Sequence, residues 1–474
     1  MSGRPSVAVL LERLAALDTK LAERDALIVR LQVRIADLEA QVKASSRNSS
    51  KPPSSDGLGK PAPKSLRPAG FRRPGGQPGH PGSRLEQVAD PDEVIRHEPA
   101  VCAGCGRGLA DAIEVGVTAR QVFDLPPITV QVIEHRLVRR RCACGTVTTG
   151  PAPARVSAPV QYGPGIRSAV TYLQAGQFLP KQRTADILSD LLKVPISSGT
   201  VSTITTEAAE TIEDSGFLDQ VRDGLAAAPV VHFDETGLRV EGKLRWVHSA
   251  STASLSLLTC HPKRGVAAMN DAGVLPAFTG TAVHDAWAPY FTYTDATHAL
   301  CGAHVLRELT AVTETTEEAA LPWAEQAATA LLDLKALVEA ALTAGQDRIA
   351  PALLERHRAL LRSAATIGVN ENAGKDGRLA AKHRALGRRL LEREDEYLRF
   401  ATNLRVPFDN NAAEREVRMI KIRQKISGCM RTMTGATGFC TIRSYLATAR
   451  KHGITYYDAL RQLADGQAWT PIRA

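Results

Sequence analysis

The chain has 474 residues, 44% hydrophobic residues and a formal net charge of +9, which predicts three or four domains and favours a polyanionic partner. No stretch reaches the roughly 18 apolar residues of a membrane span, and charged residues interrupt every apolar run near the N-terminus, which argues against a signal peptide. We therefore expect a cytoplasmic protein with no membrane contact, whose eight cysteines do not form a disulfide framework.

Residues 1–43 are predicted to hold a coiled coil for dimerisation. Apolar residues occupy two heptad positions from residue 10 to residue 42, with Arg24 as the one polar exception. The two positions contain Leu14, Leu21, Ile28, Ile35 and Val42, and Leu10, Leu17, Leu31 and Leu38. A heptad pattern of this length indicates self-association. The alternative is an amphipathic helix that packs on its own protein.

Residues 44–89 are rich in Ser, Pro, Gly and basic residues. Between residues 43 and 84, nine Lys or Arg residues stand against one acid, Asp56. Such a segment cannot bury enough apolar surface to offset its ordering entropy. It is predicted to be a basic linker, either simply solvated or acting as an arm that contacts DNA phosphates.

Residues 90–150 are predicted to form a zinc-ribbon module. The cysteines come as two close pairs, each at a glycine-containing turn that lets the backbone curl round a metal: Cys102 and Cys105, and Cys142 and Cys144. Four thiolates would hold a structural Zn²⁺ with no open position. Ribbon strands are expected within 128–137. The alternative is reduced, metal-free cysteine.

Residues 160–215 are predicted to form a helix-turn-helix-like DNA-binding region. Apolar periodicity indicates helices at 166–178 and 184–192, and Ser197 or Ser198 is a candidate cap for a third helix that runs to residue 212. Two helices joined by a short turn are typical of proteins that read the major groove. The alternative is a generic hairpin of two helices.

Residues 225–305 and 405–455 are predicted to form an α/β catalytic core. The strands are expected at 229–234, 245–251, 255–260, 282–285 and 299–301, with a helix near 264–273. Three strands, a helix and then further strands is the order of a ribonuclease H-like core. Asp234 and Asp285 would end neighbouring strands of that core. Residues 306–404 are predicted to be an all-helical insertion, so the whole chain is a multidomain α+β protein.

Glu414 begins a basic helical pattern in which Arg418, Lys421 and Lys425 fall on the same face. Carboxylates at the ends of buried strands suit Mg²⁺, which takes oxygen ligands and keeps positions open for phosphate. Two such ions drive in-line displacement at phosphorus. We therefore expect Asp234, Asp285 and Glu414 to hold metal, and the cations to contact DNA. The alternative is an ordinary surface pair of Glu414 with Arg418.

Other polar and aromatic residues near the two aspartates have simpler interpretations. His232 and His284 precede the aspartates by one or two residues and are expected to be packed or hydrogen-bonded neighbours rather than ligands. Trp287 and Tyr290 either stack on an unpaired base or belong to the core, and the core role is favoured.

Cys301 and His304 form a Cys-x-x-His pair just after the last predicted strand. We expect a buried structural pair. The alternative is a metal site shared with Cys260 and His261.

Several motifs occur along the chain: Asn-Ser-Ser-Lys-Pro-Pro-Ser-Ser-Asp at 48–56, Gly-Gly-Gln-Pro-Gly-His at 75–80, the zinc-ribbon cysteines, His-Phe-Asp-Glu-Thr-Gly at 232–237, Val-His-Asp-Ala-Trp-Ala-Pro-Tyr at 283–290, Cys-Gly-Ala-His-Val-Leu-Arg-Glu-Leu at 301–309, and Asp-Asn-Asn-Ala-Ala-Glu-Arg at 409–415 with Lys421, Lys425, Ser427 and Gly428. Together they resemble the insertion sequence sixty-six family of DDE transposases, and the resemblance covers nearly the whole chain. The second cysteine pair departs from the family pattern, because it is Cys-x-Cys instead of Cys-x-x-Cys.

The resemblance implies a DDE transposase that binds the ends of its insertion sequence. Its catalytic triad falls on Asp234, Asp285 and Glu414, which would bind two Mg²⁺ or Mn²⁺ ions for phosphodiester hydrolysis and 3′-OH strand transfer into target DNA. The expected DNA contacts are Lys421, Arg418, Lys425 and Arg415. The expected partners are DNA, a second copy or higher oligomer, and small accessory proteins of the same element, in the nucleoid of a bacterium.

Three other functions are consistent with parts of the sequence. They are a zinc-containing DNA-binding regulator with an inactive nuclease core, a host nuclease such as a junction resolvase, and a coiled-coil scaffold. The scaffold leaves the three carboxylates unexplained, and the resolvase does not need the coiled coil, zinc module and helical region together.

Overall fold

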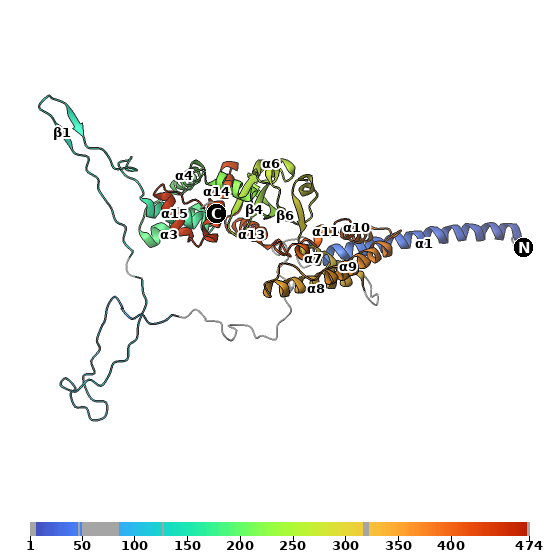
Figure 1. Cartoon of the computed structure of the whole chain (residues 1–474), viewed down its shortest axis with the longest axis horizontal. Coiled ribbons are helices and arrows are strands. Elements are labelled where there is room, and N and C mark those ends of the chain that lie inside the picture. Colours follow the sequence, from blue (N-terminus) through green and yellow to red (C-terminus); the bar gives the residue numbers. More distant parts are fainter. Residues whose placement is uncertain (1–5, 46–47, 50–84, 126–127, 316–321, 472–474) are drawn as a thin grey trace, which may run out of the picture.

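The computed structural model describes residues 6–45, 48–49, 85–125, 128–315 and 322–471 (Figure 1). It is a mixed α and β protein, as predicted. Most of the predicted linker, including the motif at 75–80 and all but two residues of the motif at 48–56, lies outside these ranges. Of the helices in the described residues, none combines the length and apolar character that crossing a membrane requires.

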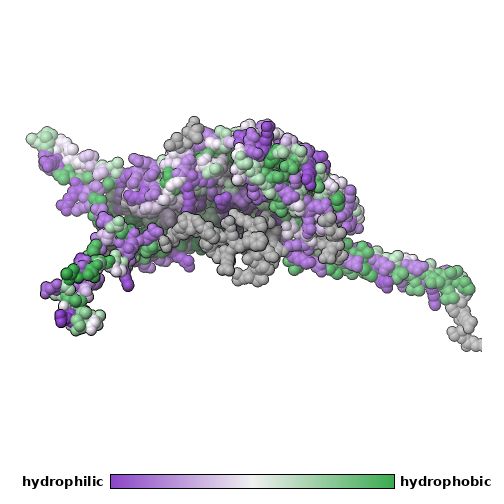
Figure 2. Space-filling view, turned by 60° about the horizontal axis from the view of Figure 1, so that its bottom comes forward, coloured by the Kyte–Doolittle hydropathy of each residue, from purple (hydrophilic) through white to green (hydrophobic). Residues whose placement is uncertain are grey.

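Helix α1, Val7–Lys43, covers the predicted coiled coil and projects away from the rest of the protein (Figure 1). Within the described part of the chain, none of its residues is buried, and apolar side chains are exposed along its length (Figure 2). Its C-terminal part is fixed by Asp37, which accepts hydrogen bonds from the backbone N–H groups of Arg378 (3.2 Å) and Leu379 (2.9 Å). A carboxylate at this place stabilises a helix N-terminus.

The cysteine module contains one two-stranded antiparallel sheet, formed by β1, Arg139–Arg141, and β2, Val147–Thr149. The prediction of strands at 128–137 is wrong, because the described residues there form no ladder and their side chains are exposed. The strands pair instead around the turn at Cys142, where the Cys142 N–H donates to the Thr146 carbonyl and the Gly145 N–H to the Cys142 carbonyl. Turn geometry, rather than β-propensity, sets the register here.

The three helices predicted after the zinc module are present. They are α2, Pro164–Thr171, continued by the π-helical turn η2, Tyr172–Gly176; α3, Lys181–Leu192; and α4, Ser198–Asp214. Ser197 is the cap of α4, since its hydroxyl accepts from the Thr200 N–H at 3.0 Å. Val170, Leu188 and Val201 join the three helices in a small core.

The central sheet has five strands in the order β5-β4-β3-β6-β7. The strands are β3, Val230–Val240; β4, Lys243–Ser251; β5, Ser256–His261; β6, Thr281–His284; and β7, Thr297–Leu300. The first three are antiparallel, whereas β6 and β7 run parallel to β3. Helix α6, Val266–Ala272, and the short turns η3, Leu275–Ala277, and η4, Ala288–Thr292, connect β5, β6 and β7.

Helix α14, Met433–Lys451, is buried against the sheet and protects its edge strand β5. The Ser444 hydroxyl accepts from the Leu258 N–H (2.8 Å), and the Thr448 hydroxyl accepts from the Ser256 N–H (3.1 Å). These bonds satisfy backbone groups that an edge strand would otherwise expose.

The helices before the sheet pack on α14 as well, together with α5, Phe217–Ala226, and α15, Tyr456–Ala464. Ile212 of α4 and Phe217 of α5 share one hydrophobic core with Tyr445 of α14. The predicted helix-turn-helix-like region is therefore packed directly on the sheet domain.

The segment between β7 and the last long helices is helical throughout its described part, as predicted. It contains α7, Gly302–Thr315; α8, Trp323–Thr343; α9, Pro351–Glu371; α10, Arg378–Glu392; α11, Glu394–Tyr397; and α12, Arg399–Thr402. Helical periodicity in the sequence indicates segments at 305–309, 323–342 and 379–400, and α9 lies between the last two of these. These helices form a second core around Trp323 and Leu331, so the insertion folds as a unit that leaves the sheet and returns to it. Helix α13, Asn411–Ser427, then packs on β3 and β4.

Replacing Gly302 with alanine is predicted to destabilise the junction between β7 and the insertion. The Gly302 N–H donates to the Phe408 carbonyl at 2.8 Å, and a Cβ atom would overlap the Phe408 ring. Overpacking of this kind costs about 1–3 kcal/mol, measurable as a lower midpoint in denaturant. Gly265→Ala is the control, because its Cβ meets no described atom within 4 Å. Equal midpoints for the two variants would contradict the prediction.

Candidate active site

Asp234 lies inside β3, not at its end as the sequence predicted. The strand continues to Val240 because it pairs with β4 along its whole length. Its pairing with β6, however, stops at His232. Asp234 is therefore the second residue beyond the parallel pairing, on the half-buried part of the strand that β6 does not cover. Its Oδ1 accepts from the Glu235 N–H at 2.8 Å.

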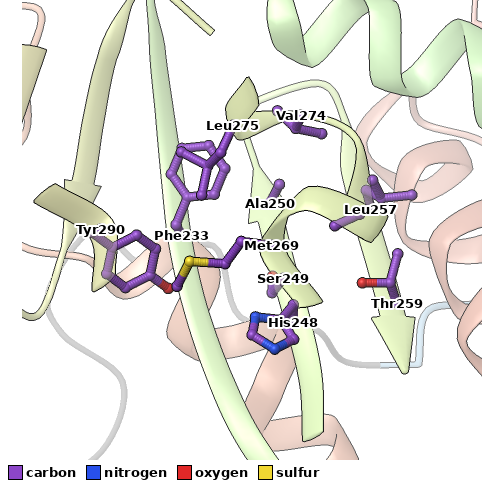
Figure 3. A pocket seen from close by; sticks show the side chains of 11 residues that line it. Phe233, His248, Ser249, Ala250, Leu257, Thr259, Met269, Val274, Leu275 and Tyr290 are labelled. Atoms are coloured by element: carbon purple, nitrogen blue, oxygen red, sulfur yellow. The ribbon is translucent and has the colours of Figure 1, made fainter. Parts of the chain in front are cut away.

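Successive residues of β3 face opposite sides of the sheet. Phe233, on the side away from Asp234, lines a small cavity with Tyr290 and Met269 (Figure 3). This side is mostly apolar core. His232, on the same side as Asp234, has its Nδ1 2.9 Å from the Asn410 side-chain oxygen, so it is a hydrogen-bonded neighbour, as predicted.

Asp285 follows β6 directly and is half-buried. Its Oδ1 accepts from the Trp287 N–H at 3.0 Å. The intervening Ala286 has a left-handed backbone with φ of 70°, a conformation that costs a non-glycine residue energy and is concentrated at functional sites. His284 is fully buried and has its Nε2 3.0 Å from His298 Nδ1, so it too is a packed neighbour. The turn thus fixes the direction of the Asp285 carboxylate.

Glu414 is in the first turn of α13, and Asn410 holds that turn in place. Asn410 is 1% exposed. Its side-chain N–H donates to the Phe233 carbonyl at 2.7 Å, and its backbone N–H donates to Cys301 Sγ at 3.2 Å. One residue therefore links α13 to β3 and to the end of β7. Since β7 lies beside β6 and β6 beside β3, Glu414 lies near the C-terminal ends of β6 and β7, close to the two aspartates.

The three carboxylates interact electrostatically. Burial raises the pKa of Asp234 well above its ordinary value, and the charges of Glu235, Asp285 and Glu414 raise it further. Burial also raises the pKa of Glu414, an effect that Arg307 opposes and that Asp409 and Asp285 reinforce. Mutually repelling carboxylates in a partly buried site are suited to a divalent cation, because the ion removes the cost of keeping them charged.

The tightest cluster of candidate ligands is one that the sequence did not predict. Among the described residues, the one group of three whose ligand atoms lie within 4.8 Å of one another is Cys301, His304 and Glu414. The three predicted carboxylates do not form such a group with each other. Ligands shared between two ions about 3.5–4 Å apart span more space than the ligands of a single ion.

The alternative pairing of Cys301 and His304 with Cys260 and His261 is wrong. Cys260 lies against the buried Cys440 of α14, and His261 Nε2 is 3.0 Å from an Asp271 oxygen. The position of the Cys-x-x-His motif in the sequence is the signal that could have predicted its neighbours. A motif at the C-terminal end of β7 lies near the C-terminal end of β6, because the two strands are parallel neighbours.

Glu235, for which the sequence predicts no separate role, is buried, and as the next residue of the strand it faces the opposite side of β3 from Asp234. It accepts from the Tyr290 hydroxyl at 2.6 Å and from two nitrogens of Arg264 at 3.0 and 2.6 Å. The Arg264 guanidinium lies 4.0 Å from the centre of the Trp287 ring and 4.7 Å from that of Trp246. Tyr290 therefore has the core role that was favoured, and Trp287 stacks on an arginine in this structure.

The basic residues of α13 have different environments. Arg415, Arg418 and Lys425 are exposed. Lys421 is half-buried, and its ammonium group donates to the Gly237 carbonyl of β3 at 2.7 Å. Lys421 therefore makes a structural bond that the helical pattern did not indicate, and its contact with phosphate stays a prediction.

The structure brings together the cysteines of each pair but not the two pairs. Hydrogen bonding with Cys105 and its turn lowers the pKa of Cys102. Hydrogen bonding, first of all with Thr146 and also with Cys142, lowers the pKa of Cys144 to about 7. Both turns therefore favour thiolates, the form that binds zinc. Figure 1 shows the cysteine module as two extended parts that lie apart from each other. Binding of one zinc ion by all four thiolates therefore requires the two cysteine turns to approach each other.

Replacing Asn410 with alanine is predicted to lower the free energy of unfolding by about 1–3 kcal/mol, the usual cost of leaving buried polar partners unsatisfied. The partners are the Phe233 carbonyl and the His232 ring. Chemical denaturation measures the loss. Asn411→Ala is the matched control, since Asn411 is exposed and should change stability by less than about 0.5 kcal/mol. A loss at Asn411 as large as that at Asn410 would refute the assignment.

Replacing Asp234 with asparagine is predicted to stabilise the protein at pH 8 without divalent ions. A raised pKa in the folded state means that the contribution of this carboxyl to stability is present below its unfolded pKa and is lost as pH rises through the folded pKa. A gain of about 1 kcal/mol raises Tm by about 2–4 °C.

The Tm difference between Asp234→Asn and the wild type should therefore be larger at pH 8 than at pH 5, and Mg²⁺ should raise the Tm of the wild type more than that of the variant. Asp295→Asn, at an exposed position, is the control. No dependence of the difference on pH would contradict the electrostatic account.

Comparison with known families gives three matches, two of which agree with each other. Residues 159–438, more than half of the chain, match the model described as Transposase IS66 family. Residues 99–145 match the zinc-finger binding domain of transposase IS66, which supports structural zinc in the cysteine module. Residues 5–86 match a family of unknown function, and the chain has no match among the curated proteins. The chain therefore belongs to the IS66 family of transposases, proteins that bind and process DNA.

Proposed function

We propose that this transposase uses a DDE mechanism, with Asp234, Asp285 and Glu414 as the metal-binding carboxylates. The observation that supports it best is electrostatic: the charges of Asp285 and Glu414 both raise the pKa of Asp234, although the three residues are far apart in the sequence. Mg²⁺ or Mn²⁺ held there, two ions per site, would supply charge stabilisation for phosphodiester hydrolysis and 3′-OH strand transfer into target DNA.

The order of the sheet supports a ribonuclease H-like catalytic core. Three antiparallel strands followed by two strands parallel to the first, in the order β5-β4-β3-β6-β7, match the arrangement expected for that core. Residues 225–305 and 405–455 would form it, and residues 306–404 would be its insertion. In this arrangement the protein orients the carboxylates through its backbone: Asp285 by the turn at Ala286, and Glu414 by the anchored start of α13.

We propose that DNA lies along the exposed side of α13. Arg415, Arg418 and Lys425 are exposed there and would contact phosphates, which supplies affinity without sequence preference. Lys421 would reach a phosphate near the scissile bond only by giving up its bond to Gly237. Helices α3 and α4, within residues 160–215, are the candidate helix-turn-helix for the element ends.

The remaining proposals concern assembly and compartment. Zn²⁺ bound by Cys102, Cys105, Cys142 and Cys144 would join the two cysteine turns, because metal binding supplies folding energy to small modules of this kind. The exposed apolar positions of α1 support pairing with a second copy, which would hold two element ends in one complex. We further propose that the basic residues 44–89 act as an arm on DNA, that small accessory proteins of the element assist, and that the protein works in the bacterial cytoplasm at the nucleoid.

A strand-transfer assay with element-end DNA and Mg²⁺ tests the proposed mechanism. Asp234→Asn, Asp285→Asn and Glu414→Gln should each reduce cleavage and joining by at least about a hundredfold while DNA binding persists. Glu325→Gln, in the insertion and exposed, should retain full activity. Full activity of any triad variant would remove that residue from the site, and nicking without joining by the wild type would favour a resolvase-type nuclease instead.

A further inference from the structure

The sulfur of Cys301 and the imidazole of His304 lie beside the Glu414 carboxylate, where β7 ends and α7 begins. Cys301 follows β7 directly, and His304 is in the first turn of α7. The sulfur, a ring nitrogen and a carboxylate oxygen lie within 4.8 Å of one another. The three come from two segments more than a hundred residues apart, so tertiary packing, not local sequence, creates the cluster.

Two of these atoms are buried and make no hydrogen bond. Within the described part of the chain, His304 Nδ1 and Glu414 Oε1 have no hydrogen-bond partner. Leaving such buried atoms without a hydrogen-bond partner destabilises the protein. The same two atoms lie 3.5 Å apart, which is close to the separation of about 3.3–3.4 Å that two ligands have on one tetrahedral ion with bonds of about 2.0–2.1 Å. Their geometry therefore fits two ligands of a shared ion.

The ligand types favour zinc over magnesium. A thiolate and an imidazole are soft or intermediate donors that suit Zn²⁺, whereas Mg²⁺ is bound by oxygen. On binding, the Cys301 thiol loses its proton to solvent and the thiolate bonds to the ion. The Asn410 N–H that donates to Cys301 Sγ at 3.2 Å stabilises negative charge on that sulfur. Three protein ligands leave the fourth tetrahedral position open.

Arg307 is the group that opposes a cation here. Its Nη2 lies 3.9 Å from Glu414 Oε1, and its Nε is also buried without a partner among the described residues. Binding of an ion therefore requires Oε1 to turn from the guanidinium to the metal. One thiolate and one carboxylate nevertheless balance the two charges of Zn²⁺, so the ion and its three ligands together carry no net charge.

We propose that Cys301, His304 and Glu414 form a second zinc site, separate from the four-cysteine module. Its consequence rests on the proposed function: Glu414 would be shared, so zinc at this site withdraws a carboxylate from the magnesium centre and inhibits cleavage. The site would make the transposase sensitive to the concentration of free zinc.

Zinc stoichiometry of the full-length protein tests the site without reference to activity. The protein is equilibrated in a chelator-buffered solution of nanomolar free Zn²⁺, separated from unbound metal and analysed for zinc. The wild type should hold one equivalent more than His304→Gln, Cys301→Ser or Glu414→Gln. Because the readout is this difference, it does not depend on how much zinc the cysteine module holds.

Matched controls separate the site from its neighbours. Cys429→Ser and His452→Gln remove an exposed thiol and an exposed imidazole elsewhere and should keep the wild-type amount of zinc. Asp234→Asn should also keep it, which distinguishes this site from the magnesium centre. Circular dichroism confirms folding, and the isosteric Glu414→Gln decides the result if the buried Cys301→Ser is unfolded. Equal zinc in the wild type and in folded His304→Gln or Glu414→Gln would overturn the proposal.

The inhibitory consequence is measured separately. At fixed Mg²⁺, the zinc concentration that halves cleavage should be at least tenfold higher for His304→Gln than for the wild type, each normalised to its own activity without zinc. The same half-inhibitory concentration in both would overturn the inhibitory consequence while leaving the zinc count to decide the site. If the wild type does not cleave at all, the proposed DDE mechanism fails and the zinc count still stands.

Discussion

Repulsion between buried carboxylates is the constraint on which the site depends. Four carboxylates lie near one another in the central part of the sheet domain: Asp234, Glu235, Asp285 and Glu414. Burial and the charges of their neighbours raise the pKa values of Asp234, Glu235 and Glu414. Such a cluster persists only where the surrounding structure holds it. On one side of β3, Glu235 is neutralised by Arg264 and bonded by Tyr290. On the other side, Arg307 lies 3.9 Å from Glu414 Oε1 without a hydrogen bond to it, and no cationic side chain among the described residues forms a salt bridge with Asp234, which makes that side the one suited to metal cations.

The position of Glu414 is fixed by hydrogen bonds that neighbouring residues make, not by its own side chain. The all-helical insertion, with its own core around Trp323, separates β7 from α13 by about a hundred residues but returns the chain to the same place. There Asn410 bonds to β3 and to Cys301, and the Gly302 N–H bonds to the Phe408 carbonyl. An insertion with a core of this kind destabilises the sheet domain little, because loop-closure entropy grows slowly with length. Its position lets α7 contribute Cys301 and His304 to the surroundings of Glu414.

Much of the fold followed from local pattern. Short apolar, β-rich runs predicted the five strands, and helical periodicity predicted the helices before the sheet. The failures have physical causes. Strand β3 is longer than its apolar run, since pairing with β4 carries it past Asp234. The strands at 128–137 are absent from the described structure because β-propensity without a packing partner is weak. Helix α9 was missed where its polar residues obscure the apolar stripe.

The sequence by itself determined the family, the identity of the candidate carboxylates, the cysteine pairs and the exposed heptad stripe of α1, because motifs and periodicities are local properties of the chain. Only the tertiary structure decided which residues meet. It gave Lys421 a bond to Gly237, paired Arg264 with Glu235 between two tryptophans, and placed Cys301 and His304 at Glu414 instead of near Cys260. Contacts between segments about a hundred residues apart depend on the order of the strands and on where the chain re-enters the sheet domain after the insertion. A local sequence pattern does not determine which distant segments come into contact.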